Sequence, residues 1–156
     1  MHPIAPVFDA SAYRLILGSF PSVKSREGCF FYHHPQNRFW KVLSAVFKAK
    51  CPLSIDEKKE FLYCHGLALW DVIASCDIEA SADKSIKRAV PNDISRILSQ
   101  TQIKKIYLNG ATAFTFYKRL LAPSIVLPYY KLPSTSPANA GYSLERLVDA
   151  WMLIKE

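Results

Sequence analysis

Residues 30–40 bring aromatic rings, two imidazoles, an amide and a guanidinium together in consecutive positions. The segment reads Phe-Phe-Tyr-His-His-Pro-Gln-Asn-Arg-Phe-Trp. Rings that can stack, next to hydrogen-bonding groups with little charge, suit a flat and neutral heterocycle. These residue types therefore point to a nucleobase as the ligand.

A second short motif lies upstream and predicts where the pocket is built. The apolar run 13–17 is typical of a buried strand, and Gly18 with Pro21 marks a tight turn at its end. The loop that follows is longer than most connections, and its aromatic content favours a functional loop. A strand that opens into such a loop places a pocket beyond the carboxyl ends of a parallel sheet.

The composition is that of one folded domain, which we expect to span residues 1–156. Half of the residues are hydrophobic and 13% are aromatic, so the chain can bury a substantial core. No apolar run reaches the roughly 18 residues of a membrane span, and the N-terminus does not resemble a signal peptide. We therefore expect a cytoplasmic monomer without a membrane partner, associated with the nucleoid if the cell is prokaryotic.

The charge and the cysteines narrow the choice of ligands. A net charge of +7 favours a polyanionic partner such as nucleic acid, with ordinary surface charge as the alternative. None of the four cysteines forms a Cys-x-x-Cys pair, and Cys29 with His33 and His34 lacks the further ligands of a metal site. We expect reduced thiols, no metal and no organic cofactor.

Strands and helices alternate along the chain. The apolar patterns predict strands at 13–17, 67–73, 105–108 and 124–127, helices starting near 37, 56, 93, 110 and 143, and an irregular polar segment at 75–91. This alternation predicts an α/β fold, a three-layer α/β/α sandwich with a short, mostly parallel central sheet. The loops 18–37 and 132–142 both follow strands, so we expect them to meet at one edge of the sheet.

Three strings give the chain a family resemblance. They are Gly-Ser-Phe-Pro-Ser at 18–22, Tyr-His-His-Pro-Gln-Asn-Arg-Phe-Trp-Lys-Val-Leu at 32–43, and Leu-Pro-Ser at 132–134. Together they resemble the uracil-DNA glycosylase superfamily, and most closely its hypoxanthine-DNA glycosylases. The resemblance spans residues 15–151. It implies a monofunctional enzyme of base excision repair that hydrolyses the N-glycosidic bond of a flipped deaminated base, hypoxanthine (deoxyinosine), and leaves an abasic site.

The chain departs from the common family pattern at two positions. Many members carry a catalytic Asp or Asn where Phe20 stands, and a catalytic His where Leu132 stands. In the hypoxanthine branch the essential residue is the Asn of the His-Pro-x-Asn string, which maps onto Asn37. An amide can orient water through its carbonyl or donate N–H to the departing base. From the residues alone, a helix N-cap is the simpler interpretation of Asn37, and both roles can coexist.

The resemblance also implies a set of binding residues. The base-binding pocket would contain Gly18, Ser19, Phe20, Pro21, Tyr32 and His34, with the ring of Tyr32 stacked on the flipped base. Contacts to DNA would come from Lys24, Arg38, Ser134, Thr135 and Ser136. Core packing is the alternative for the rings, and ordinary turn chemistry is the alternative for the hydroxyls.

Three other functions remain open. A uracil or thymine mismatch-specific glycosylase would differ in pocket volume, and a catalytically inactive nucleic-acid-binding module would bind DNA without product. A Ser/His hydrolase is disfavoured because no Gly-x-Ser-x-Gly elbow is present. No lysine falls on the pocket positions, which favours a monofunctional enzyme, although Lys24 leaves lyase activity open. The expected partner is damaged DNA, in double-stranded form.

Overall fold

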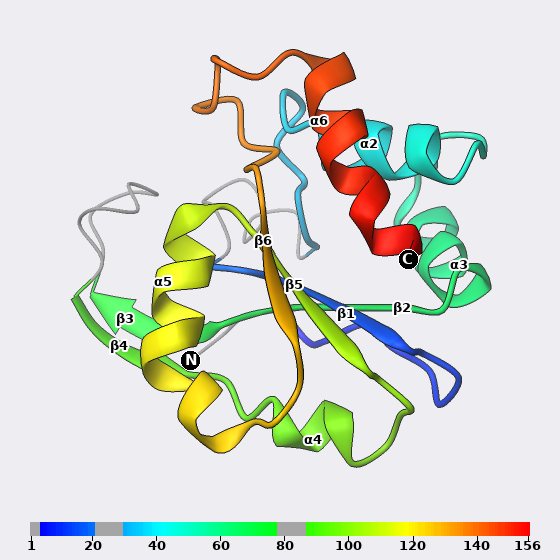
Figure 1. Cartoon of the computed structure of the whole chain (residues 1–156). Coiled ribbons are helices and arrows are strands. Elements are labelled where there is room, and N and C mark those ends of the chain that lie inside the picture. Colours follow the sequence, from blue (N-terminus) through cyan, green and yellow to red (C-terminus); the bar gives the residue numbers. More distant parts are fainter. Residues whose placement is uncertain (1–3, 21–29, 78–86) are drawn as a thin grey trace.

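A four-stranded parallel sheet forms the centre of the molecule (Figure 1). The computed structural model describes residues 4–20, 30–77 and 87–156. The sheet contains β1 (Arg14–Gly18), β2 (Leu67–Asp71), β5 (Lys105–Asn109) and β6 (Tyr129–Leu132), in the order β2-β1-β5-β6. Every residue of β1 and β2 is buried, as expected for strands covered on both faces.

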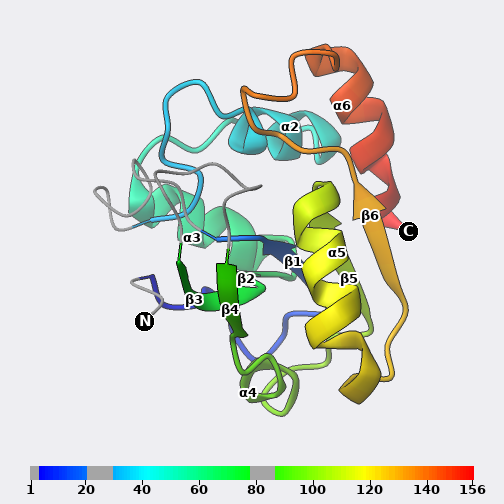
Figure 2. The same cartoon turned by 90° about the vertical axis from the view of Figure 1, so that its left-hand side faces the viewer.

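Helices cover both faces of this sheet and give the molecule three layers. Figures 1 and 2 show α2 (Phe39–Val46), α3 (Ile55–Cys64) and α6 (Leu144–Trp151) on one face, and α5 (Ala111–Leu120) on the other. A short helix and two 3-10 turns complete the chain: α4 (Ser95–Leu98), η2 (Ala122–Ser124) and η3 (Met152–Lys155). The predicted three-layer α/β/α sandwich is therefore confirmed.

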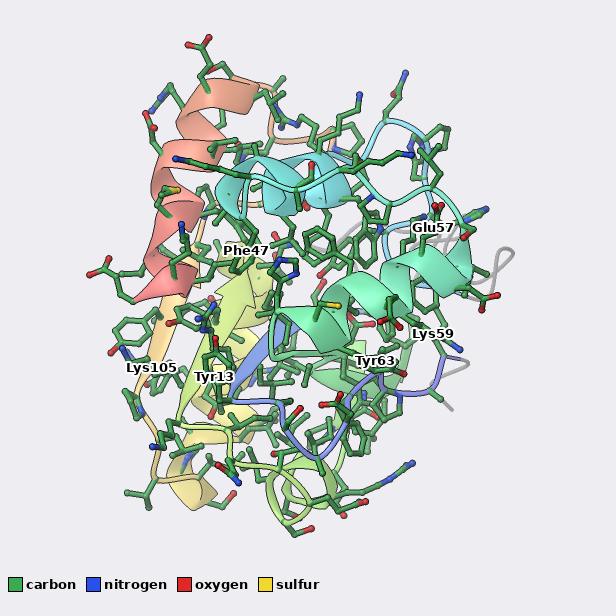
Figure 3. The ribbon with its side chains drawn as sticks, turned by 90° about the vertical axis from the view of Figure 1, so that its right-hand side faces the viewer. Tyr13, Phe47, Glu57, Lys59, Tyr63 and Lys105 are labelled. Carbon is green, nitrogen blue, oxygen red and sulfur yellow. The ribbon has the colours of Figure 1, made fainter. Side chains whose placement is uncertain are left out.

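Local sequence signals set the helix boundaries. Ser54 accepts a 3.0 Å hydrogen bond from the N–H of Glu57, whose carboxylate accepts the N–H of Ser54 in return, so a capping box starts α3. Figure 3 looks onto this helix from outside, with Glu57 and Lys59 towards its start and Tyr63 towards its end. Ser143 caps α6 as the sequence predicts.

The last strand differs from the sequence prediction. Its expected position was 124–127, but the strand is 129–132 and follows the turn η2. Val126 is 98% exposed, whereas Ile125 and Leu127 are half-buried against the core, so this apolar run lies beside the core without forming a strand. The chain enters the sheet as β6 only after Pro128.

The segment expected to be irregular also contains strands. At its two ends β3 (Ile73–Asp77) and β4 (Lys87–Pro91) pair antiparallel, outside the main sheet. The pairing shifts register at two places, so the sequence lacks the regular polar–apolar alternation that would predict this strand pair.

The strand register aligns one residue from each strand at the carboxyl edge of the sheet. Asp71 pairs with Gly18, and Asn109 pairs with Leu132. The pairing of β1 with β5 places Gly18 next to Asn109 in the same row. Two segments meet above this row: the one before α2 and the one after β6, which we call the 133–142 loop (Figure 1). The N–H of Arg38 donates a 3.1 Å bond to the carbonyl of Thr135 there, so the expected meeting of the two loops is confirmed.

Candidate active site

The side-chain oxygen of Asn37 accepts two hydrogen bonds. The backbone N–H of Phe39 donates one at 2.9 Å, and the hydroxyl of Thr135 donates the other at 2.9 Å. The N-cap position of α2 is Arg38, so Asn37 supports the helix start from one residue further out. Because a backbone N–H can only donate, the amide atom that faces it must be the oxygen.

This orientation leaves the NH2 group of Asn37 as the available end of the amide. Within the described ranges, no side chain or carbonyl accepts a hydrogen bond from it. An amide oxygen has two lone pairs, and both already face donors. The geometry therefore disfavours a carbonyl that orients water and fits an amide that donates N–H to a base.

Thr135 connects Asn37 to the end of β5. Its hydroxyl accepts a 3.1 Å bond from the amide nitrogen of Asn109, and its backbone N–H donates a 3.1 Å bond to the amide oxygen of Asn109. These two bonds fix the orientation of the Asn109 amide. The side chains thus form a hydrogen-bond network in which Asn109 donates to Thr135 and Thr135 donates to Asn37.

The burial of Thr135 disfavours the predicted contact between this side chain and DNA. The residue is 0% exposed, and its hydroxyl is used by the two asparagines. A phosphate oxygen cannot reach a buried hydroxyl whose hydrogen is already donated. The side chain of Thr135 orients Asn37 instead.

Arg38 holds the 133–142 loop. Its Nη1 donates to the carbonyl of Tyr142, and its Nη2 donates to the carbonyls of Asn139 at 3.0 Å and Ser136 at 3.3 Å. Both terminal nitrogens of this half-buried guanidinium are thereby occupied by main-chain oxygens. The predicted phosphate contact through Arg38 does not fit this arrangement, and the structure gives the residue a role in holding the loop.

Ser134 and Ser136 use their hydroxyl oxygens inside the same loop. The Oγ of Ser134 accepts the N–H of Ser136 at 3.1 Å, and the Oγ of Ser136 accepts the N–H of Ala138 at 3.1 Å. These bonds are the ordinary turn hydrogen bonds that the sequence suggested as the alternative to DNA contacts. Each hydroxyl keeps its hydrogen for donation, so phosphate contacts by Ser134 and Ser136 stay predictions.

Tyr32 stands above the end of β1 in an unusual conformation. Its backbone has a φ of 53°, in the left-handed region that aromatic residues rarely adopt. One face of its ring stacks on Phe39, with centroids 4.0 Å apart and planes inclined by 18°. No second described ring covers the other face. Stacking of a base on that face stays a prediction.

The hydroxyl of Tyr32 is buried against the row of residues at the sheet edge. No described residue lies within hydrogen-bonding geometry of it, and a Cβ at Gly18 would lie 2.8 Å from it. Glycine is therefore required at this position by close packing. Burial raises the pKa of Tyr32 far above its usual value, the charge of Asp71 raises it further, and the Asn109 side chain opposes the shift. The phenol is protonated throughout the physiological range.

Two further predicted pocket residues, Ser19 and Phe20, lie at the same edge of the sheet. Ser19 and Phe20 are half-buried and continue directly from β1, and the carbonyl of Ser19 accepts a 3.0 Å bond from the N–H of Ile73. The Nδ1 of His34 accepts the N–H of Gln36 at 3.1 Å, which makes its Nε2 the protonated nitrogen of the neutral ring. Base contacts by these residues stay predictions. Pro21 and Lys24 lie outside the described residues.

Sequence reasoning missed two residues that support the site. Asn109 was not among the residues predicted for the site, although an amide at the carboxyl end of a buried strand is a recognisable signal. Trp151 donates a 2.9 Å bond from its indole N–H to the carbonyl of Pro133, which ties α6 to the start of the 133–142 loop. No local pattern distinguishes this tryptophan from an ordinary core residue.

No group of three or more His, Cys, Asp or Glu side chains in residues 4–20, 30–77 and 87–156 is arranged to hold a metal ion. Over the same ranges, no helix has the length and apolarity needed to cross a bilayer.

The fold and the site define an α/β/α protein with its ligand site at the carboxyl edge of a parallel sheet. The sequence model of the uracil DNA glycosylase superfamily matches residues 5–155. The chain therefore belongs to the uracil DNA glycosylase superfamily.

Two relatives and one solved structure illustrate this membership. The hypoxanthine DNA glycosylase of Methanosarcina acetivorans is 30% identical over 142 residues, which are 90% of this chain and 89% of the relative. That of Methanosarcina barkeri is 30% identical over 107 residues, 67% of this chain and 68% of the relative. A solution NMR structure of a candidate uracil DNA glycosylase from Methanosarcina acetivorans superimposes with a TM-score of 0.81 at 26% identity, covering 98% of this chain and 97% of the other.

Proposed function

We propose that this chain is a hypoxanthine DNA glycosylase in which the NH2 group of Asn37 donates to the departing base. The observation that carries the proposal is the hydrogen-bonded chain from Asn109 through Thr135, which turns the Asn37 oxygen inward and leaves its N–H groups available. The choice of hypoxanthine is supported by the two Methanosarcina relatives with that name.

The proposed reaction is hydrolysis of the bond between C1′ of the sugar and N9 of the base. The nucleotide is first flipped out of the duplex. The electron pair of the C1′–N9 bond leaves with the base, and the sugar passes through a state with oxocarbenium character. Water then adds to C1′ and loses a proton to solvent, and the departing base anion takes up a proton, which leaves an abasic site and free hypoxanthine.

Asn37 would act on the charge of the leaving group. A keto purine spreads the incoming electron pair over O6 and its ring nitrogens, and an N–H donor held in place stabilises that charge as it develops. Removing one such donor typically lowers the rate by about 100- to 1000-fold. This role does not require Asn37 to gain or lose a proton.

The remaining assignments follow from the same model. The base would lie against Tyr32, above Gly18, Ser19 and Phe20, with His34 at the side of the pocket. The substrate would be double-stranded DNA in the cytoplasm, handled by a monomer that consists of one domain. Simple hydrolysis makes the enzyme monofunctional, since no step uses an amine nucleophile.

A uracil- or thymine-specific activity is the second candidate. The family and the protein of the similar NMR structure are both named for uracil, a pyrimidine, which favours this second candidate. The two candidates share the fold and the flipped-base mechanism, so the released base has to be identified directly.

The test uses labelled duplexes that each contain one hypoxanthine, uracil, xanthine or mismatched thymine. Formation of abasic sites is scored for the wild type, for Asn37→Ala and for Gln36→Ala, an exposed neighbouring amide that serves as the control. Hypoxanthine release that is lost only in Asn37→Ala is the expected result. Release of uracil or thymine alone would select the second candidate, and DNA binding without any product would refute the glycosylase proposal.

A further inference from the structure

We propose that Arg146, in the first turn of α6, binds a backbone phosphate of the DNA substrate, on a surface that it forms with the 133–142 loop. The choice of DNA as the ligand rests on the proposed function. Sequence reasoning did not assign Arg146 any role.

Two arginines hold the 133–142 loop. Arg38 donates hydrogen bonds to three of its carbonyls, as described above. Arg146 donates a 3.0 Å bond from Nη1 to the carbonyl of Gly141 and lies over the ring of Tyr142, 4.3 Å from the centroid. The loop contains no regular secondary structure, so these contacts fix its shape.

The two arginines differ in what they can still bind. Both terminal nitrogens of Arg38 are occupied and the residue is half-buried, whereas Arg146 is exposed. A guanidinium has several N–H donors, and a described residue accepts only the one that reaches Gly141. The free edge of Arg146 is therefore available for the bidentate contact that guanidinium makes with phosphate.

Among the described residues, no carboxylate neutralises the positive charge at this place. Glu145 and Asp149 lie on the same helix and are exposed, but neither forms an ion pair with Arg146, and no described carboxylate pairs with Arg38. A cation in the first turn of a helix also opposes the helix dipole, so stability of α6 does not explain it. A residue whose charge conflicts with its position in a helix is expected at a functional surface.

The surface also fits a DNA backbone in shape and position. The exposed part of the loop consists of small residues, Pro137, Ala138, Ala140 and Gly141, which let a sugar-phosphate chain approach closely. The same loop carries the Thr135 that orients Asn37. A phosphate bound at Arg146 would therefore have a fixed position relative to Asn37, which is how backbone contacts align a substrate without reading its sequence.

The experiment measures equilibrium binding to a duplex that contains a stable abasic-site analogue, at several salt concentrations. For Arg146→Gln we expect the slope of log affinity against log salt to fall by about 1, the loss of one phosphate contact. Near 0.1 M salt this corresponds to roughly tenfold weaker binding. Undamaged duplex should be affected by the same factor, since the contact carries no sequence or lesion information.

Two further variants separate a phosphate contact from other causes. Arg119→Gln removes the same charge from α5, where the exposed Arg119 guanidinium lies over Phe116 at 4.7 Å in a similar ring contact. It should leave the slope and the rate of base release unchanged. Arg146→Lys keeps the charge but cannot reproduce the planar contacts with the loop, so it should restore most of the slope.

Each outcome bears on the proposal. A reduced slope in Arg146→Gln, intact in Arg119→Gln and largely restored in Arg146→Lys, supports it. Equal slopes for wild type and Arg146→Gln overturn it, and so does an equal reduction in both Gln variants, which would report net charge alone. If the wild type binds DNA but releases no base, the proposed function fails while the slopes still decide the role of Arg146.

Discussion

The hydroxyl of Thr135 donates a 2.9 Å hydrogen bond to the side-chain oxygen of Asn37, across a separation of 98 residues in the sequence. The same hydroxyl accepts from Asn109, so a buried threonine transmits the orientation of one amide to another. A donor that must point at a leaving group benefits from such restraint, because its orientation is settled before the reaction. The relationship makes Thr135 a positioning residue.

Replacing Thr135 by Val tests this relationship. Valine keeps the shape but has no hydroxyl, so the Asn37 amide loses one restraint and the Asn109 nitrogen loses its acceptor. We expect a roughly tenfold slower single-turnover rate, the effect of about 1.4 kcal/mol. We also expect unfolding to be easier by roughly 1–3 kcal/mol, because a buried donor is left unpaired. Thr135→Ser should recover both, and full activity of the Val variant would show that the bond does not orient Asn37.

Asn37→Asp separates support of the helix from catalysis. A carboxylate accepts the bonds from Phe39 and Thr135 as the amide does, and more strongly because of its charge. It has no N–H to donate at neutral pH. We therefore expect a thermal midpoint close to that of the wild type together with about 100- to 1000-fold slower base release. An active Asp variant would refute donation and return the role of orienting water to the carbonyl.

The sequence predicts the layers of this fold well, because buried parallel strands are continuous apolar runs and helices carry their own caps. Ser143 is one such cap. The rule that loops after parallel strands meet at one edge correctly brought Asn37 near the Pro-Ser segment. These predictions need only local patterns and topology.

The direction of individual side chains was harder to predict. The last strand was placed at 124–127, and its true position at 129–132 decides which residues of the following loop turn inward. Thr135 and Arg38 were expected to contact DNA, whereas Thr135 is buried and the half-buried Arg38 donates to main-chain carbonyls. The sequence alone does not distinguish a hydroxyl or guanidinium that binds a phosphate from one that binds a main-chain carbonyl of the same protein.

Arg38→Ala should weaken the 133–142 loop. Three carbonyls lose a charged donor, and we expect a loss of about 2 kcal/mol in unfolding free energy, in the range of bonds to charged groups. Base release should slow as well, since the loop holds Thr135. Arg38→Lys should recover only part of the stability, because one ammonium cannot span the three carbonyls. Chemical denaturation measures the loss of unfolding free energy. If Arg38→Ala instead reduced the dependence of DNA affinity on salt, Arg38 would be a phosphate contact as the sequence predicted.

Tyr32 gives the protein a dependence on alkaline pH. Burial holds the pKa of Tyr32 in the folded chain above the value near 10 expected when unfolded, so the unfolded chain releases this proton first. The stability that the protonated phenol contributes is complete below about pH 10 and is lost as the pH rises towards the folded value. Each such group lowers the unfolding free energy by up to about 1.4 kcal/mol per pH unit in that window.

Tyr32→Phe tests that dependence and the role of the hydroxyl together. The variant removes a buried hydroxyl without a partner and keeps the ring, so stability at neutral pH should be unchanged or higher, and its decline above pH 10 should be shallower. Tyr117→Phe is the matched control, because its hydroxyl, on α5, is also buried without a hydrogen-bond partner among the described residues, and burial raises the pKa of Tyr117 to about 12. Both variants should release base at the wild-type rate if the ring of Tyr32 acts by stacking alone. A rate that falls only in Tyr32→Phe would show that the bound base supplies the partner that this hydroxyl lacks.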